Sequence, residues 1–295
     1  MNHTKTHKLF DHPLLGMAVS VLLVYFLYLI LSLLHKTVYY IATGSSATDQ
    51  ISNAVITIVS SLLYLLFHQL WFRGELKHFF GVKGLGRAVW IGSGILVVIL
   101  VELILHIWSG EKIGNVLIAV ILGIAPGINE EVAWRIIPVS IAMRQKEKKG
   151  VIWMAFFLPS LVFGLIHGMN LLAGADLLST LFQMIYAIGL GLIFAAIYLR
   201  TGNIWASMLL HSLVDIVAFL SADMQQSGGV LTTSADLSAY WLQMIFIVIF
   251  FVNALVAFRR SRREEIPAVW DRIWESSDSG NEQPDTGAPD QSRRD

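Results

Sequence analysis

The stretch ILGIAPGINEEVAWRIIPVSIAMR, residues 121–144, places two adjacent carboxylates and one cation in the middle of an otherwise apolar run of membrane length. An ionised group at the centre of a bilayer costs roughly 2.5 kcal/mol or more, so such groups usually face a protein interior and serve a function. Glu131 and Arg135 are four residues apart, which puts them on one helical face where they can pair. Glu130 is rotated by about 100° from that face and has no local partner. Glu130 is therefore the first candidate for a functional residue.

The composition of the 295-residue chain is typical of a membrane protein. Hydrophobic residues make up 55% of it and charged residues 14%, whereas soluble domains carry roughly 25% charged residues. The formal net charge is zero, and the charges are segregated rather than pooled into a basic face, so no nucleic-acid partner is expected. The absence of Cys excludes disulfides, thiolate zinc sites and a Cys nucleophile.

Apolar segments of about 20 residues, the length that a bilayer needs, recur along the chain. Lys and Arg are concentrated in alternate loops between these segments, as the positive-inside rule requires of a multi-pass protein. We therefore predict an all-α, polytopic membrane helical bundle with about eight transmembrane helices and both termini in the cytoplasm. The expected spans are residues 14–34, 51–72, 88–108, 114–143, 151–172, 177–199, 203–222 and 238–258.

The fourth of these spans contains Pro126 and Gly127 directly before the acid pair. A proline inside a helix removes one backbone hydrogen bond and tends to kink the helix. Two interpretations stay open: a helix bent at its functional residues, or a kink that only shapes packing. The small-residue pairs Gly123–Gly127 and Gly164–Gly168 let helices approach closely, which predicts a tight junction of the fourth and fifth spans.

Two further polar clusters lie inside predicted spans. His167 closes the apolar stretch FLPSLVFGLIH, and Phe163 stands one turn before it. His211 and Asp215, in LLHSLVD, are four apart on one face of the seventh span. Histidine and carboxylate on a shared face can orient a proton-transfer group, bind a metal or stabilise an oxyanion. A single intramembrane histidine more often makes an interhelical hydrogen bond, but three polar clusters on three spans must converge or stay unpaired.

Glu102 and His106 form one more pair of polar residues four apart, on the third span. The simpler interpretation is a pair that stabilises a contact within the bundle. The alternative is a supporting role at the site or in an ion pathway.

Several intramembrane hydrolase chemistries are excluded by inspection. The chain has no H-E-x-x-H zinc helix, no G-x-S-G serine site, and no Y-D with a G-x-G-D partner for an aspartyl pair. A carboxylate with histidine remains: a Glu that takes a proton from water, and His or Asp groups that hold the water and the developing oxyanion.

The polar clusters form an ordered set of motifs, Glu130-Glu131-x-x-x-Arg135, Phe163-x-x-x-His167 and His211-x-x-x-Asp215. In this order they resemble the three motifs of the CPBP family, also called Abi, which includes type II CAAX prenyl endopeptidases and bacteriocin-processing or self-immunity proteins. The resemblance covers about residues 114–220. It implies an intramembrane endopeptidase whose site lies within the helical bundle.

The resemblance also implies a role for each motif. In the family, the first Glu and the His of the second motif activate a water molecule, which here are Glu130 and His167. The third motif forms an oxyanion hole, which maps to His211 and Asp215. The remaining motif residues support the site; they are Glu131, Arg135 and Phe163.

The metal question stays open at the level of sequence. The family is often labelled as metalloproteases, whereas the alternative is a glutamate–water mechanism without metal. Asp215 stands where the prenyl endopeptidases usually carry Asn, and an ionised Asp cannot donate to an oxyanion. It must be protonated, orient His211, or bind a metal. The cofactor is therefore none or a divalent metal such as zinc, with Glu130, His167, His211 and Asp215 as the ligands if one is bound.

The expected setting is a multi-pass protein of a bacterial plasma membrane, because the composition resembles that of bacterial proteins. This favours a membrane-associated peptide or protein as substrate over a prenylated CAAX protein, with membrane lipid as the other partner. Two alternatives remain. One is a non-catalytic self-immunity or scaffold protein that uses the polar cavity for recognition. The other is an ion-coupled transporter that uses Glu102, Glu130 and the histidines.

The chain divides into four expected parts. Within the last part, residues 264–275 predict a short interfacial helix with Trp270 and Trp274 at headgroup level, and residues 276–295 predict disorder. The parts are the first three transmembrane helices at 1–113, a catalytic CPBP-like helical core at 114–222, the last transmembrane helix at 223–263 and a cytoplasmic, mostly disordered tail at 264–295.

Overall fold

The structure is a computed structural model that describes residues 12–45, 49–72, 84–110, 112–230 and 237–278. Within these ranges the chain is helical and has no strand, apart from an isolated β-bridge between Ile113 and Ser221. The predicted all-α polytopic bundle is confirmed. The helices are α1 (Pro13–Thr43), α2 (Gln50–Phe72), α3 (Leu85–Ile91), α4 (Ser93–Ser109), α5 (Val116–Glu131), η3 (Val132–Ile136), α6 (Ile137–Met143), α7 (Val151–Ile166), η4 (His167–Ala173), α8 (Leu177–Thr201), α9 (Ile204–Ala218), α10 (Ala222–Ser227), α11 (Leu237–Ala257), α12 (Arg260–Arg263) and α13 (Ile266–Asp278).

The described helices include six that are long and apolar enough to span a membrane, or up to seven if a bent pair counts as one span. The bent pair is α3 and α4, which meet at 69° and together occupy the predicted third span. The predicted seventh span contains α9, whose 15 residues extend over only about 23 Å at 1.5 Å per residue. That is shorter than the ~30 Å hydrocarbon core. The described residues therefore supply six or seven candidate spans where about eight were predicted. The cytoplasmic location of the termini stays a prediction.

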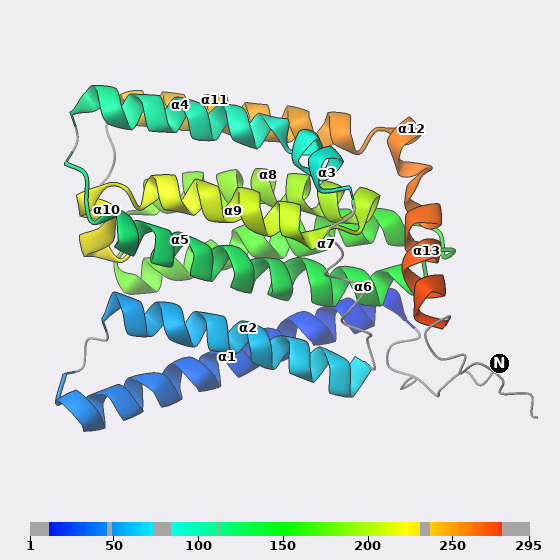
Figure 1. Cartoon of the computed structure of the whole chain (residues 1–295), viewed down its shortest axis with the longest axis horizontal. Helices are drawn as coiled ribbons and strands as arrows, with labels where there is room; N and C mark the ends of the chain where they lie inside the picture. Colours follow the sequence, from blue (N-terminus) through cyan, green and yellow to red (C-terminus); the bar gives the residue numbers. More distant parts are fainter. Residues whose placement is uncertain (1–11, 46–48, 73–83, 111, 231–236, 279–295) are drawn as a thin grey trace, which may run out of the picture.

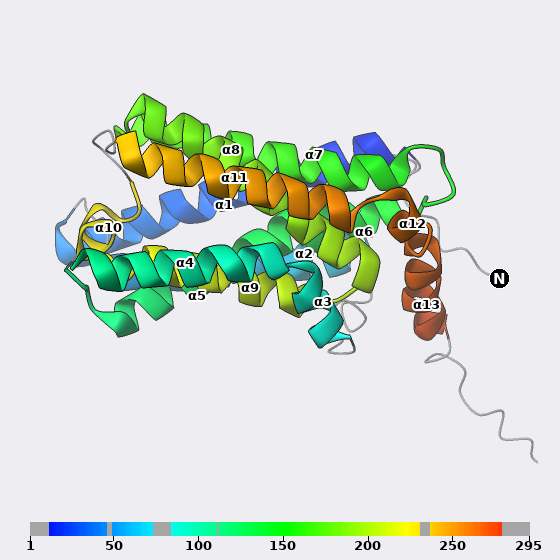
Figure 2. The same cartoon turned by 90° about the horizontal axis from the view of Figure 1, so that it is seen from above.

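The long helices run side by side in three layers (Figure 1). The central layer holds α5 with α6, α7, α8 and α9, of which α8 is the most buried of the candidate spans. On one side this layer is covered by α1 and α2, and on the other by α4 and α11. Figure 2 shows the same bundle from above; α11 packs along α8, and α4 packs along α9. All three polar motifs therefore lie on helices of the central layer.

Glycines allow the closest approaches between helices. The helices that they bring together are not the pair that the sequence predicts. A Cβ on Gly127 would lie 2.3 Å from Oγ and 2.7 Å from the backbone nitrogen of Ser212, on α9. A Cβ on Gly164 would lie 2.6 Å from the carbonyl oxygen of Met184, on α8. The glycines therefore do not join the fourth and fifth spans to each other: α5 meets α9, and α7 meets α8. Those two spans contact each other instead through η3 and α6, which pack on α7. Small residues show that a helix is closely approached, but they do not name the partner.

The acid-bearing span changes its helical geometry directly after the acid pair. The α-helix continues through Pro126 and becomes a π-helix over Val132–Ile136 before α6 begins. A π-turn accommodates one extra residue per turn and often occurs at functional sites. The irregular backbone therefore lies on the residues that follow Glu131 rather than at the proline.

The C-terminal helix α13 crosses one end of the bundle (Figure 1). The predicted helix is confirmed, although it extends to Asp278, past the predicted start of disorder. Trp270 is fully buried, and its indole Nε1 donates to the carbonyl oxygen of Leu199, 3.0 Å away, at the end of α8. Trp270 therefore packs on the protein rather than facing outward, and its level relative to the headgroups stays a prediction. The rest of the predicted disordered tail, 279–295, lies outside the described residues.

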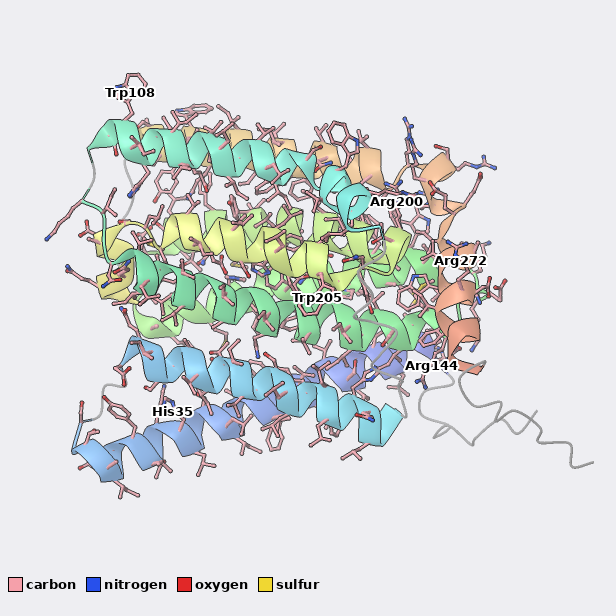
Figure 3. The ribbon with its side chains drawn as sticks, in the orientation of Figure 1. His35, Trp108, Arg144, Arg200, Trp205 and Arg272 are labelled. Carbon is pink, nitrogen blue, oxygen red and sulfur yellow. The ribbon has the colours of Figure 1, made fainter. Side chains whose placement is uncertain are left out.

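Ion pairs complete the attachment of α13. Glu265, just before the helix, contacts Arg87 and Arg200. Burial raises the pKa of the Glu265 carboxyl, but the guanidinium groups of Arg87 and Arg200 outweigh this and hold the pKa below its ordinary value. Arginine is concentrated at this end of the molecule, as the labelled Arg144, Arg200 and Arg272 in Figure 3 show.

Candidate active site

The structure brings the predicted site residues of all three motifs into one cluster. The two glutamates lie on the last turn of α5, and Arg135 lies on the π-helix η3. Phe163 lies near the end of α7, and His167 begins the 3₁₀-helix η4. His211 and Asp215 lie one turn apart on α9. The segments are far apart in sequence, and the close α5–α9 and α7–α8 contacts bring them together.

A fully buried ion pair forms the base of the cluster. Arg135 Nη1 lies 3.1 Å from Glu131 Oε1, and neither side chain is exposed, which confirms the predicted pairing. The guanidinium is stacked between two rings, with Cζ 4.7 Å from the centre of Phe163 and 5.3 Å from that of Phe194. Gly191 provides the space, because a Cβ there would lie 3.1 Å from Arg135 Nη2. A rigidly enclosed cation of this kind fixes the position of Glu131.

His211 lies among three carboxylates. Its Nδ1 is 3.0 Å from Glu131 Oε1, and its Nε2 is 3.5 Å from Glu130 Oε2 and 3.7 Å from Asp215 Oδ2. Its ring also stacks on Phe194, with centres 5.0 Å apart. Both ring nitrogens therefore face acidic oxygens. Glu130, which has no partner on its own helix, finds one on α9.

His167 is held in a defined tautomer. Its Nδ1 lies 2.8 Å from the carbonyl oxygen of Phe163. Because a carbonyl oxygen can only accept, Nδ1 carries the hydrogen, and Nε2 of the neutral ring keeps its lone pair. The geometry leaves His167 Nε2 as a proton acceptor.

A cavity of about 480 Å³ lies beside this cluster and is lined by Glu130, His167 and Asp215. The Glu130 side chain is 31% exposed and that of Asp215 24%, whereas Glu131 is not exposed at all. The adjacent acids thus occupy different environments, one in the cavity and one in the core. Helices α1 and α2 supply the opposite wall, which includes Tyr25, Tyr28, Asn53 and Thr57.

Asn170 and Gln183 are among the lining residues that the sequence analysis did not name. A 3₁₀-helix has three residues per turn, so residues i and i+3 are eclipsed. Asn170 therefore stands on the same side of η4 as His167. Its Nδ2 donates to Gln183 Oε1, 2.9 Å away on α8. The spacing His167-x-x-Asn170 was the available signal in the sequence. It places the two side chains directly above each other only if the segment is a 3₁₀-helix rather than an α-helix.

Glu130, His167, His211 and Asp215 are the ligands expected if a metal is bound. Within the described ranges, no group of three or more His, Asp or Glu side chains has an arrangement that could hold a metal ion.

Glu102 lies at the margin of the cluster. From α4 it interacts electrostatically with Tyr186 on α8 and with Asp215 on α9. This favours a supporting position beside the third motif. A contact between Glu102 and His106 stays a prediction.

The described residues thus form a bundle of membrane-length helices with a Glu- and His-lined cavity. Residues 112–217 match the family model described as type II CAAX prenyl endopeptidase Rce1-like, and this range contains all three motifs. The match confirms the resemblance of residues 112–217 to the CPBP family, which at the family level is a family of intramembrane endopeptidases. Comparisons with curated proteins and with solved structures gave no match.

Proposed function

We propose that this protein is an endopeptidase that cleaves membrane-associated peptides or proteins with a water molecule activated by Glu130 and His167. One observation carries the proposal: Glu130 and His167 line the same cavity, while the charged pair behind them is sealed in the core. Two proton acceptors on one cavity wall can bind and deprotonate a single water. The substrate class follows from the site's position on membrane-length helices.

The reaction uses only groups of this chain. Glu130, with His167 Nε2, takes a proton from water, and the hydroxide attacks the scissile carbonyl carbon. The resulting tetrahedral oxyanion collapses, the C–N bond breaks, and the abstracted proton passes to the leaving amine. His211 holds the Glu130 carboxylate in place through Nε2, and the pair Glu131–Arg135 holds His211 through Nδ1.

The oxyanion requires a hydrogen-bond donor that faces the cavity. The sequence assigned this role to His211 and Asp215, but both nitrogens of His211 face carboxylates. We therefore propose that Asn170 contributes a donor beside them. Gln183 accepts one hydrogen of the Asn170 amide, which orients Nδ2, and the second hydrogen of Nδ2 is left for substrate.

Asn170→Asp is expected to lower kcat by about 10²- to 10³-fold with little change in KM, the usual effect of removing one oxyanion donor. The replacement keeps the size of the side chain and exchanges the NH₂ for an oxygen. Steady-state kinetics of the purified variant would measure kcat and KM separately. Wild-type kcat in Asn170→Asp would remove Asn170 from the oxyanion site.

The proposed function is tested with purified wild type and Glu130→Gln, incubated with a library of membrane-associated peptides and analysed by mass spectrometry. Glu147→Gln is the matched control, because the Glu147 side chain is 85% exposed and lies outside the cavity. Cleavage by wild type and Glu147→Gln but not by Glu130→Gln is expected, with and without a chelator. Retained cleavage by Glu130→Gln contradicts the proposal. Absence of cleavage by folded wild type favours a peptide-binding immunity or scaffold protein.

A further inference from the structure

A second pocket, of about 250 Å³, lies where the loop after α6 enters α7. It shares no lining residue with the active-site cavity. Its lining holds four cations and one carboxylate, Glu147, whose side chain is 85% exposed. The cations are Lys146, Lys148, Lys149 and Arg263. The proposed peptidase mechanism uses none of them.

The floor of this pocket is the first turn of α7. Gly150 is the N-cap of α7 and offers no side-chain cap. Ile152 and Trp153, the second and third residues of α7, line the pocket. The first turn of a helix presents backbone N–H groups together with the positive end of the helix dipole. Combined with the basic side chains, this turn is suited to a phosphate.

The basic groups differ in how they are held. Arg263 is fixed: its Nη1 donates to the carbonyl oxygen of Phe258, 3.3 Å away, and its guanidinium lies 4.2 Å from the centre of the Trp153 ring. Lys146 is neutralised by an ion pair with Asp271 at 2.7 Å. Lys148 and Lys149 are exposed on the rim. The pocket thus combines one positioned guanidinium with two exposed lysine residues.

The position of the pocket favours a lipid headgroup over a soluble anion as the source of the phosphate. It lies at the end of a membrane-length helix, where phospholipid headgroups are found. Trp153 is 42% exposed and stacks on Phe157, which is 44% exposed, one turn further into the membrane segment. Exposed aromatic residues at a helix end are typical of the membrane interface. An acyl chain below the headgroup would run along these rings, which a soluble anion would not use.

We propose that this pocket binds the headgroup phosphate of an anionic phospholipid. Lys148, Lys149 and Arg263 neutralise the phosphate, and the N–H groups of Ile152 and Trp153 donate to its oxygens. Basic pockets at the ends of transmembrane helices bind lipid headgroups in this way. A bound lipid would hold the start of α7, the helix that ends at His167.

The test is a lipid titration of the delipidated full-length chain by native mass spectrometry, with dioleoyl-phosphatidylglycerol and dioleoyl-phosphatidylcholine as probes. One phosphatidylglycerol is expected to bind more tightly than phosphatidylcholine. Lys148→Ala/Lys149→Ala is expected to weaken its binding by about 25-fold, since each basic residue near an anionic surface contributes roughly a factor of five. Lys148→Arg/Lys149→Arg is expected to retain binding, which separates charge from folding.

The matched control is Arg259→Ala/Arg260→Ala, which removes the same charge from exposed positions outside the pocket. It is expected to leave the affinity within about twofold of wild type, a difference well below the effect of one basic group. Equal losses in both double variants, or equal affinity for the two lipids, would overturn the proposal. Displacement of the lipid by excess inorganic phosphate would overturn its lipid part. None of these readouts needs peptidase activity.

Discussion

Arg135→Met is expected to destabilise the folded protein by about 3–5 kcal/mol, the usual cost of leaving one member of a buried ion pair alone. The substitution removes the guanidinium that lies 3.1 Å from Glu131, and no water can reach either side chain. It also removes the cation enclosed by Phe163 and Phe194. Unfolding of the purified protein in mixed micelles with increasing denaturing detergent would measure the loss.

Two control variants make this prediction specific. Arg260→Met removes an arginine that is 88% exposed, and the expected change is below about 1 kcal/mol. The double variant Glu131→Leu/Arg135→Met removes both buried charges and is expected to recover most of the stability. If the double variant is as unstable as Arg135→Met, the loss comes from packing around the guanidinium and not from the unpaired carboxylate.

His167→Gln is expected to lower kcat by about 10³- to 10⁴-fold, near the upper range for loss of a general acid–base group. Gln can still donate to the carbonyl of Phe163, but it has no ring nitrogen with a lone pair to take a proton from water. The fold is expected to remain, because His167 lies at the cavity and is only half-buried. Single-turnover cleavage of a peptide found with the wild type would measure the rate.

The combined effect of the Glu130 and His167 substitutions on the rate tests whether the two residues act on the same water molecule. If both residues act on one water, Glu130→Gln/His167→Gln is expected to be no slower than the slower single variant, because groups that act as a unit are not additive. Rate losses that multiply would show that the two residues act independently and would contradict a shared water. Thermal unfolding of each variant checks that the loss is not one of folded protein.

Some features of the site could be predicted because they depend on local spacing. Glu131 and Arg135 are one helical turn apart, and the pair survives the change to π geometry at Val132. The three motifs were expected to converge because unpaired charges are costly in a membrane, and His211 does lie beside both glutamates. Neither inference needs knowledge of which helices are neighbours.

Other features depend on which helices are neighbours and on the exact turn geometry. A 3₁₀ turn puts Asn170 beside His167, and nothing in the local sequence distinguishes this turn from a continued α-helix. Buried Trp270 donates to a carbonyl oxygen at the end of α8. The sequence of α13 alone does not indicate that this partner is nearby.

The sequence by itself determined a membrane helical bundle, the charged pair in its fourth span and three polar clusters inside its spans, whose peptidase roles are implied by the family resemblance. These depend on composition, periodicity and i,i+4 spacing, which are local properties. Only the tertiary structure decided that Glu130 faces a cavity while Glu131 is sealed behind it, and that carboxylates engage both nitrogens of His211. The physical reason is the contact of Gly127 with Ser212: it brings α9 against α5, and that approach sets which acid meets solvent and which meets His211.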